Sequence, residues 1–197
     1  MNRGFLLTLT LGVVVLLAIP LTGCAVCPLW GPRLGPSPIV TGSQEMATWE
    51  YDFADFTSVN VSSAFTVDIT RSDSYRVSIT ANENLSGYLD VRKVDETLYI
   101  GLKRAGYTNI RHEATITMPE LRNLGLFSAS RVSISGFSSS SPLELDVSGA
   151  SSLNIGDVVA GDAKIFMEQA GRLFLHKPFA PEWLKEMVIN ALAQVGR

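Results

Sequence analysis

The sequence predicts an all-β domain whose strands stack in a solenoid-like arrangement. Apolar and polar residues alternate with a period of two, which is typical of strands that bury one face. The alternating runs occupy residues 65–70, 75–80 and 98–102, and turn-prone segments lie at 71–74, 81–84 and 94–96. A sequence repeat in the second half of the chain indicates that these strands stack in register.

The repeat has three copies. They centre on Ala129, Ala150 and Ala170, which are 21 and 20 residues apart. In each copy, two short alternating segments flank a corner of small residues. A fixed spacing of this size is typical of a solenoid in which each copy is one rung, and small residues suit a corner where stacked backbones come close. A β-sandwich with two similar hairpins is the alternative.

Residues from about 48 to 165 resemble the bacterial head-GIN family of auto-transporter adhesin-like proteins. The resemblance rests most clearly on Met118-Pro119-Glu120-Leu121 and on Asp146-Val147-Ser148-Gly149-Ala150-Ser151. It implies a short right-handed β-helix, often carried by an exported lipoprotein, and a role in adhesion. It supplies neither a particular ligand nor catalytic residues.

The N-terminus resembles a bacterial lipoprotein signal. Arg3 precedes an apolar run from Phe5 to Ile19, which is shorter than the roughly 20 residues of a membrane span. Leu21-Thr22-Gly23-Cys24 then resembles a lipobox. We therefore expect residues 1–23 to be a signal peptide and the Cys24 sulfur to carry membrane-anchoring acyl chains such as palmitate. An ordinary cleaved signal and an uncleaved anchor are the alternatives. Cys27 is expected to be an unpaired thiol.

Residues 24–45 are expected to tether the domain to the membrane. Prolines lie at positions 28, 32, 36 and 38, and glycines lie at 31, 35 and 42. Proline removes a backbone hydrogen-bond donor and glycine adds conformational freedom, so we expect residues 25–41 to form neither a helix nor a paired strand.

The solenoid domain is predicted to span residues 46–165, followed by an atypical tail, 166–197, with a last rung and an amphipathic helix. Apolar residues recur at helical spacing over 183–195, and we expect this helix to pack on the final rung. Lys177-Pro178-Phe179 resembles the end of the last strand in response-regulator receiver domains, where the matching lysine contacts a phosphoryl group. No acidic pocket precedes it in this chain, so we expect no phosphotransfer.

No catalytic, cofactor or metal site is predicted. The net charge of −3, without a basic run, argues against nucleic-acid binding. His112 and His176 have no metal-ligand spacing; we expect His112 on a solvated turn and His176 at a strand end on the surface. The serines of the repeated corners are expected to bond to backbone groups.

Two further groups of side chains are candidate binding sites. Asp90, Asp95 and Glu96 form a loose acidic group, but they lack the spacing of a calcium loop. Tyr88, Tyr99 and Tyr107 are expected to serve packing, with an aromatic contact to sugar or protein as the alternative.

These observations predict an exported, membrane-anchored lipoprotein of the bacterial cell envelope. We expect a non-catalytic domain that binds envelope or extracellular macromolecules, either a glycan or an envelope protein. The alternative is a structural or signalling-associated scaffold without adhesive activity. An enzyme of the β-helix type would need convergent acidic and basic residues, whereas these rungs carry mainly serine, alanine and asparagine.

Overall fold

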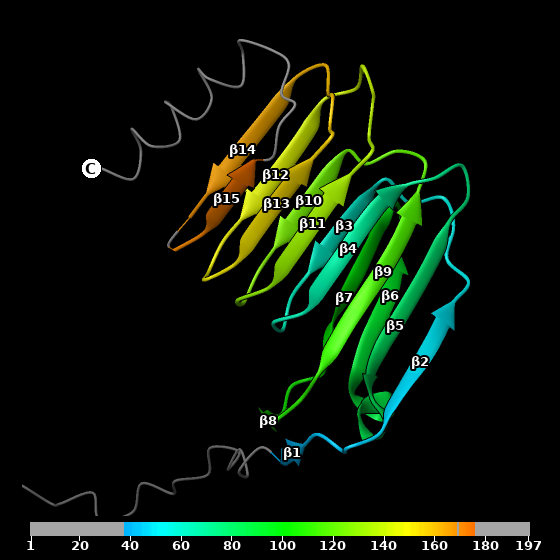
Figure 1. The fold of residues 1–197 in the computed structure, drawn as a ribbon, viewed down its shortest axis with the longest axis vertical. Helices are drawn as coiled ribbons and strands as arrows, with labels where there is room; N and C mark the ends of the chain where they lie inside the picture. Colours follow the sequence, from blue (N-terminus) through cyan, green and yellow to red (C-terminus); the bar gives the residue numbers. More distant parts are fainter. Residues whose placement is uncertain (1–37, 169, 176–197) are drawn as a thin grey trace, which may run out of the picture. The chain divides into compact units, whose positions relative to one another are not determined.

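Figure 1 shows the computed structural model, which describes residues 38–168 and 170–175. In these residues the chain forms fifteen β-strands and one short 3-10 helix, η1 (Glu83–Tyr88). The predicted all-β class is therefore confirmed. The predicted signal peptide and C-terminal helix lie outside the described residues. Within the described part, no helix has the length and apolar character needed to cross a membrane.

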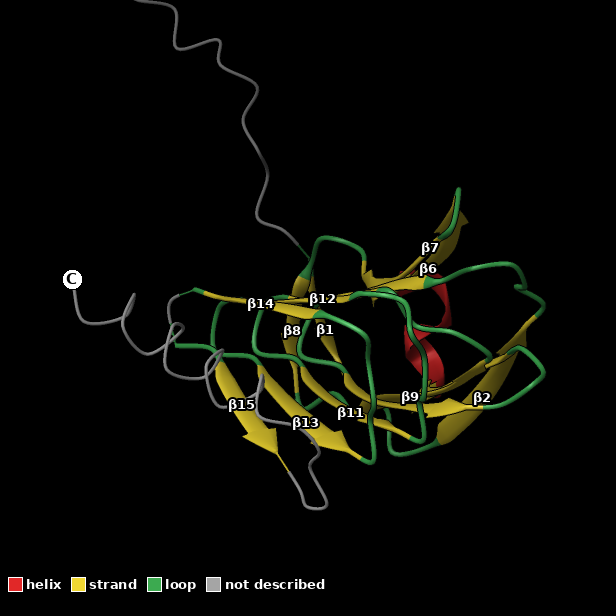
Figure 2. Ribbon diagram, turned by 90° about the horizontal axis from the view of Figure 1, so that it is seen from above, coloured by secondary structure: helices red, strands yellow, loops and turns green. Residues whose placement is uncertain are grey.

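The strands form two facing sheets and a small ribbon (Figure 2). The six-stranded sheet contains, in spatial order, β14 (Ala163–Met167), β12 (Leu143–Val147), β10 (Asn123–Leu126), β3 (Ser58–Val61), β7 (Thr97–Leu102) and β6 (Leu89–Val94). The seven-stranded sheet contains β15 (Arg172–Leu175), β13 (Ser152–Gly156), β11 (Arg131–Ser135), β4 (Thr66–Arg71), β9 (His112–Met118), β5 (Arg76–Asn82) and β2 (Met46–Tyr51). The ribbon pairs β1 (Ile39–Thr41) with β8 (Gly106–Thr108).

Consecutive strands form the rungs of the stack. In each of the rungs β3–β4, β10–β11, β12–β13 and β14–β15, the first strand lies in the six-stranded sheet and the second lies in the seven-stranded sheet. Leu124 pairs in parallel with Leu145, and Leu145 pairs in parallel with Ile165. Successive rungs are thus offset by the same 21 and 20 residues as the sequence repeat, which confirms that the repeat forms stacked rungs.

The rungs do not stack in chain order. Rung β3–β4 lies in the middle, with β10–β11 paired on one side and β7 and β9 on the other, all in parallel (Figure 1). Between β4 and β7 the chain forms β5, η1 and β6, and the two strands pair antiparallel outside β9 and β7. Residues 119–122 then lead from β9 to β10 past rung β3–β4, and the Arg122 amide donates a 2.8 Å hydrogen bond to the Thr57 carbonyl.

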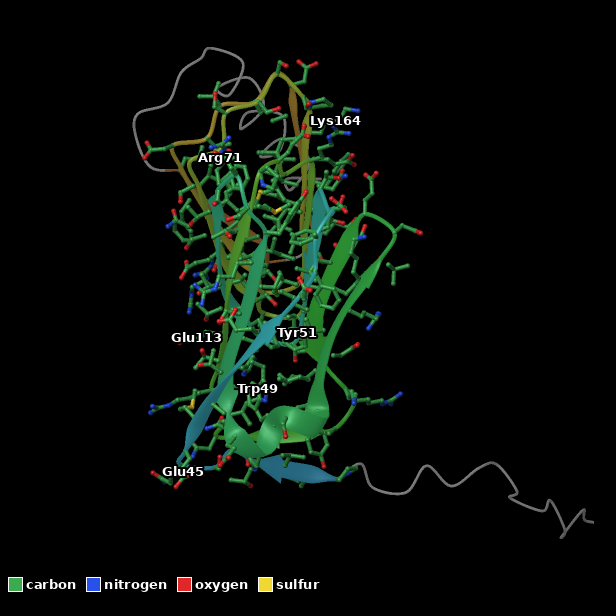
Figure 3. All side chains as sticks on the ribbon, turned by 90° about the vertical axis from the view of Figure 1, so that its right-hand side faces the viewer. Glu45, Trp49, Tyr51, Arg71, Glu113 and Lys164 are labelled. Atoms are coloured by element: carbon green, nitrogen blue, oxygen red, sulfur yellow. The ribbon has the colours of Figure 1, made fainter. Side chains whose placement is uncertain are left out.

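The stack therefore has two different ends. At the closed end, β5, β6 and η1 cover the rung formed by β7 and β9, and β2 pairs antiparallel with β5. Trp49 and Tyr51 lie along β2, which crosses this end in Figure 3, and both pack partly buried against the core. At the open end, β14–β15 is the last described rung.

The core lies between the two sheets and follows the predicted alternation. Val67 and Ile69 of β4 are buried, whereas Thr66 and Asp68 of the same strand are exposed. Parallel in-register pairing repeats this pattern in neighbouring strands, so apolar residues form rows across the rungs. One such row of the six-stranded sheet contains Leu98, Val59, Leu124, Leu145 and Ile165. Burial of each large side chain stabilises the fold by about 1.5–3 kcal/mol.

Left-handed backbone conformations make several of the corners between strands. Ser63 and Ala64 turn rung β3–β4 with φ of 61° and 60°, and Ser128 and Ala129 turn the next rung with φ of 57° and 64°. Gly149 takes this conformation in the following rung, with φ of 65°. Such angles are uncommon for residues with a Cβ and most unfavourable for bulky or β-branched ones, so the predicted small residues serve backbone turning as well as close stacking.

The N-terminal ribbon corrects one prediction. Residues 25–41 were expected to form no paired strand, yet β1 pairs in parallel with β8. The buried Asn82 fixes the chain just after β1, because its side-chain amide donates a 2.7 Å hydrogen bond to the Ser43 carbonyl and its oxygen accepts one from the Arg111 amide. The prediction was wrong because Ile39-Val40-Thr41, three β-branched residues, follow the last proline.

Candidate functional site

The predicted lipidation site, Cys24, lies outside the described residues, as do Cys27 and His176. His112 is described, and its predicted place on a solvated turn is wrong. It is the first residue of β9, its Nε2 lies 2.8 Å from the Ser63 carbonyl oxygen, and its ring packs edge-on against Phe65 at 4.4 Å. Burial is the largest influence on the pKa of His112 and lowers it, while nearby backbone carbonyls oppose this shift. His112 is thus a packed residue that favours its neutral form.

The loose acidic group does not come together as a metal site. Asp90 forms an ion pair with Arg92, whereas Asp95 turns the hairpin between β6 and β7 with φ of 52°. Glu96 accepts a 3.2 Å hydrogen bond from the Thr57 hydroxyl. In residues 38–168 and 170–175, no three His, Cys, Asp or Glu side chains gather as a metal-binding group.

The three tyrosines divide into two kinds. Tyr88 and Tyr107 pack edge-on with ring centroids 6.2 Å apart, and the Tyr107 hydroxyl donates a hydrogen bond to the Lys103 carbonyl. They serve packing, as predicted. Tyr99 instead lies on the outer face of the six-stranded sheet, because Leu98 and Ile100 on either side of it point into the core.

Tyr99 belongs to a row that crosses all six strands of its sheet. Residues paired in register line up on one face, and this row runs from the closed end to the open end through Arg92, Tyr99, Asn60, Gly125, Asp146 and Phe166. Its members combine a guanidinium, a phenol, an amide, a carboxylate and an exposed aromatic ring. The row thus places polar, charged and aromatic side chains side by side, although the first and last of them in the sequence, Asn60 and Phe166, are 106 residues apart.

A shallow pocket lies on this row near the closed end. Its volume is about 170 Å³, and its lining includes Asn60, Ser62, Asp90, Arg92, Tyr99 and Phe127. Phe127 lies just beyond β10 and is 36% exposed. The pocket therefore joins polar groups from β3, β6 and β7 to an aromatic ring from the adjacent rung.

Two glycines make room for this pocket. A Cβ atom at Gly125 would overlap the Asn60 side-chain oxygen and would lie 2.9 Å from Cε2 of the Phe127 ring. A Cβ atom at Gly101 would likewise overlap the Ser62 hydroxyl. The side chains of Asn60, Ser62 and Phe127 can therefore lie over bare backbone, which hollows an otherwise flat sheet face.

The charges at the pocket are paired. The Asp90 carboxylate accepts a hydrogen bond from the Arg92 guanidinium, whose central carbon lies 4.9 Å from the centroid of the Tyr99 ring. The hydrogen bond to Asp90 is the largest influence on the pKa of Arg92 and raises it, so the guanidinium stays charged. Pairing with Asp90 and contact with Tyr99 fix its planar group at the pocket wall.

Sequence reasoning considered Tyr99 and Asp90 but missed the pocket that joins them. The available signal was the pair of outward-facing glycines, Gly101 and Gly125, on strands that the period-two pattern identifies. Gly125 occupies the position that Asp146 and Phe166 occupy in the next two rungs. A glycine where aligned copies carry large side chains indicates a hollow on the surface.

Comparison with known proteins gives the family. Residues 55–176 match the family described as "Putative auto-transporter adhesin, head GIN domain". The chain belongs to this family. The match begins at residue 55, where the predicted range began at 48. It ends at 176, beyond the predicted 165, and so includes β14 and β15, which continue the repeat. Among curated proteins, none matches the sequence.

Two solved structures share the fold of this head GIN domain. A "putative adhesin" from Parabacteroides distasonis is 15% identical, with a TM-score of 0.65 over 70% of this chain and 59% of that chain. A "putative adhesin" from Bacteroides fragilis is 18% identical, with a TM-score of 0.63 over 68% of this chain and 63% of that chain. The chain thus spans about three fifths of the length of each of these proteins, and at this identity the likeness concerns the fold alone.

Proposed function

We propose that this protein is an exported lipoprotein of the bacterial envelope that binds envelope or extracellular macromolecules without catalysis. Acyl chains on Cys24 hold it to a membrane, and the outer face of the six-stranded sheet makes the contact. The observation that carries the proposal is the row from Arg92 to Phe166, together with the pocket beside Phe127. The adhesin description of the family supports a binding role.

The chemistry of the pocket supports binding rather than catalysis. Acid–base catalysis of bond cleavage needs a proton donor and a separate base, commonly two carboxyl groups placed on either side of the bond. Asp90 is the one carboxylate among the described lining residues, and Arg92 neutralises it. The open, shallow shape also leaves a bound group in contact with water, which weakens the electrostatic stabilisation that catalysis requires.

The segment between Cys24 and β1 is long enough to separate the domain from a membrane that holds the proposed anchor. β1 begins 15 residues after Cys24, and an extended chain of that length reaches about 50 Å. The proline-rich segment between them favours extension over compact structure. The tether can therefore hold the outer face of the sheet clear of the membrane surface.

The anchor is tested by metabolic labelling with a fatty acid in a bacterial host that expresses the full chain. We expect label in the native protein and in Cys27→Ala, and a loss of at least about tenfold in Cys24→Ala, because only the Cys24 sulfur follows the lipobox pattern. Cys27→Ala is the matched control, since it removes the neighbouring thiol. Equal labelling of Cys24→Ala and the native chain would overturn the lipoprotein assignment.

The binding face is tested by two phenylalanine variants. Phe127 borders the pocket, whereas Phe174, 51% exposed, lies on β15 of the other sheet. Full-length protein in detergent is fixed to beads and exposed to fluorescent polymers extracted from bacterial envelopes. We expect Phe127→Ala to lower the bound fluorescence severalfold and Phe174→Ala to leave it unchanged. Equal binding by both variants and the native chain would show that the pocketed face is not the contact surface.

A further inference from the structure

We propose that the pocket beside Phe127 binds one neutral hexose unit of a polysaccharide, whose chain crosses the strands toward Phe166. This assignment rests on the proposed binding function and specifies the ligand class of the same face.

The size of the pocket fits a single ring. Its volume of about 170 Å³ is well below the roughly 300–1,000 Å³ of pockets that enclose drug-sized ligands. The pocket is also open to solvent along the sheet face, so a ring bound there can remain linked to units on either side. A polymer that is recognised one unit at a time meets both conditions.

The chemistry of the pocket fits a sugar ring. A hexose has flat patches of C–H groups and a rim of hydroxyl groups, and the exposed face of Phe127 offers apolar surface for the former. The Asn60 amide and the Ser62 hydroxyl can each donate and accept hydrogen bonds, while Asp90 accepts and Arg92 donates. Because Asp90 and Arg92 form an ion pair, the described lining carries no net charge, which favours a neutral sugar over an acidic one.

Backbone hydrogen bonds fix the main chain of Phe127, the point from which its ring extends. The Phe127 amide donates a 2.9 Å hydrogen bond to the Val61 carbonyl, and the Phe127 carbonyl accepts a 2.7 Å hydrogen bond from the buried Ser130 hydroxyl. Gly125 leaves space for the ring beside Asn60. A site fixed in this way loses little conformational entropy when it binds a weakly held ligand such as one sugar.

The row indicates the path of the sugar chain. Asp146 and the 50% exposed Phe166 continue it from the pocket toward the open end. Two strand spacings separate β10 from β14, a distance of about 10 Å, which is similar to the length of two sugar units. A chain seated at Phe127 therefore places a later unit at Phe166.

The test uses full-length protein in detergent micelles and native gels that contain a neutral β-glucan, α-mannan or galactan, or acidic alginate. We expect a neutral polysaccharide to retard the protein. Calorimetry then compares a hexasaccharide and a disaccharide of that polymer. Phe127→Ala should weaken both at least about tenfold. Phe166→Ala should weaken the hexasaccharide about threefold or more and leave the disaccharide unchanged, because only the longer ligand reaches Phe166.

Two controls keep the result interpretable. Phe174→Ala, which removes from the other sheet a ring as exposed as that of Phe166, should bind both ligands as the native protein does. Gly125→Ala, whose added Cβ would displace the Asn60 side chain and the Phe127 ring from their places at the pocket, should abolish binding. A thermal melt reports whether that variant is folded, and Phe127→Ala carries the test if it is not.

Three outcomes would overturn the inference. Retardation by alginate alone would contradict a neutral sugar. Equal weakening by Phe127→Ala and Phe174→Ala would show that the pocket is not the site. If no polysaccharide retards the protein but binding of envelope polymers to the beads still depends on Phe127, the hexose proposal is rejected and the proposed binding function stands. If neither retardation nor Phe127-dependent bead binding is observed, both proposals are rejected.

Discussion

The apolar side chains on the inner faces of the sheets are buried to different extents at the two ends of the stack. At the closed end, Leu98 on β7 and Ile116 on β9 are fully buried, because β5, β6 and η1 lie beyond them. At the open end, Leu173 and Leu175 on β15 point inward in the same way but are only partly buried. Among the described residues, an apolar row is therefore fully buried only where another layer of strands follows, as in repeat proteins with capped ends.

The largest expected effect compares one leucine from each end. Leu98→Ala removes a fully buried side chain and should lower the free energy of unfolding by about 3 kcal/mol, since it leaves a cavity. Leu173→Ala removes a partly buried side chain, and we expect about 1 kcal/mol. Urea denaturation of the full chain, followed by tryptophan fluorescence and circular dichroism, measures both values.

Leu153→Ala is the control for position in the sheet. Leu153 pairs in register with Leu173 one rung further inside and is fully buried, so its loss should cost about as much as that of Leu98. If Leu173→Ala destabilises the protein as strongly as Leu153→Ala, the open end is as well covered as the inside. The helix predicted over 183–195 would then be the first segment to examine as its cover.

A smaller effect is expected at the corners, which also differ along the stack. Phe65 and His112 fill the corner row near the closed end, whereas the buried Ser130 and Ser151 occupy it toward the open end. Ser130→Ala loses the 2.7 Å hydrogen bond to the Phe127 carbonyl and should destabilise the protein by about 1 kcal/mol. The Ser151 hydroxyl has no hydrogen-bond partner among the described residues, so Ser151→Ala should be neutral or slightly stabilising.

The same denaturation experiment compares these two serines, and the two substitutions are chemically identical. A loss of about 1 kcal/mol or more in Ser151→Ala would show that its hydroxyl is satisfied and that the two corners are equivalent. The predicted role of corner serines in bonding to the backbone holds for Ser130 and also for Ser148, whose hydroxyl donates a 3.3 Å hydrogen bond to the Leu126 carbonyl.

The local features of the fold were predictable because they depend on neighbours in the sequence. The period-two runs gave strands β4, β5 and β7, and the repeat at Ala129, Ala150 and Ala170 gave the register of the later rungs. The central position of rung β3–β4 was not predicted. Its copy of the corner, Ser63-Ala64, precedes Ser128-Ala129 by 65 residues, and no fixed spacing relates two rungs when other strands lie between them.

The candidate site was less predictable for the same reason. Asn60, Asp90, Tyr99 and Phe127 come from four segments, and only the pairing of β3 with both β7 and β10 brings them together. The predicted position of His112 was wrong because its two neighbours in the sequence are charged, which suggests a solvated residue. The alternation along β9 nevertheless places His112 on the same face of the strand as the inward-facing Ala114 and Ile116. The alternation of apolar and polar residues predicts which face of a strand a side chain occupies. The order of the strands in the sheet determines which other side chains lie beside it.

The central rung also determines where this architecture can change in length. On one side, β3–β4 is bounded by strands that close the stack, and the connection through residues 119–122 passes its end. On the other side, each rung contacts only the one before and the one after it. Duplication or deletion of a unit of about twenty residues there would change the length of the stack and leave the pocket beside Phe127 untouched.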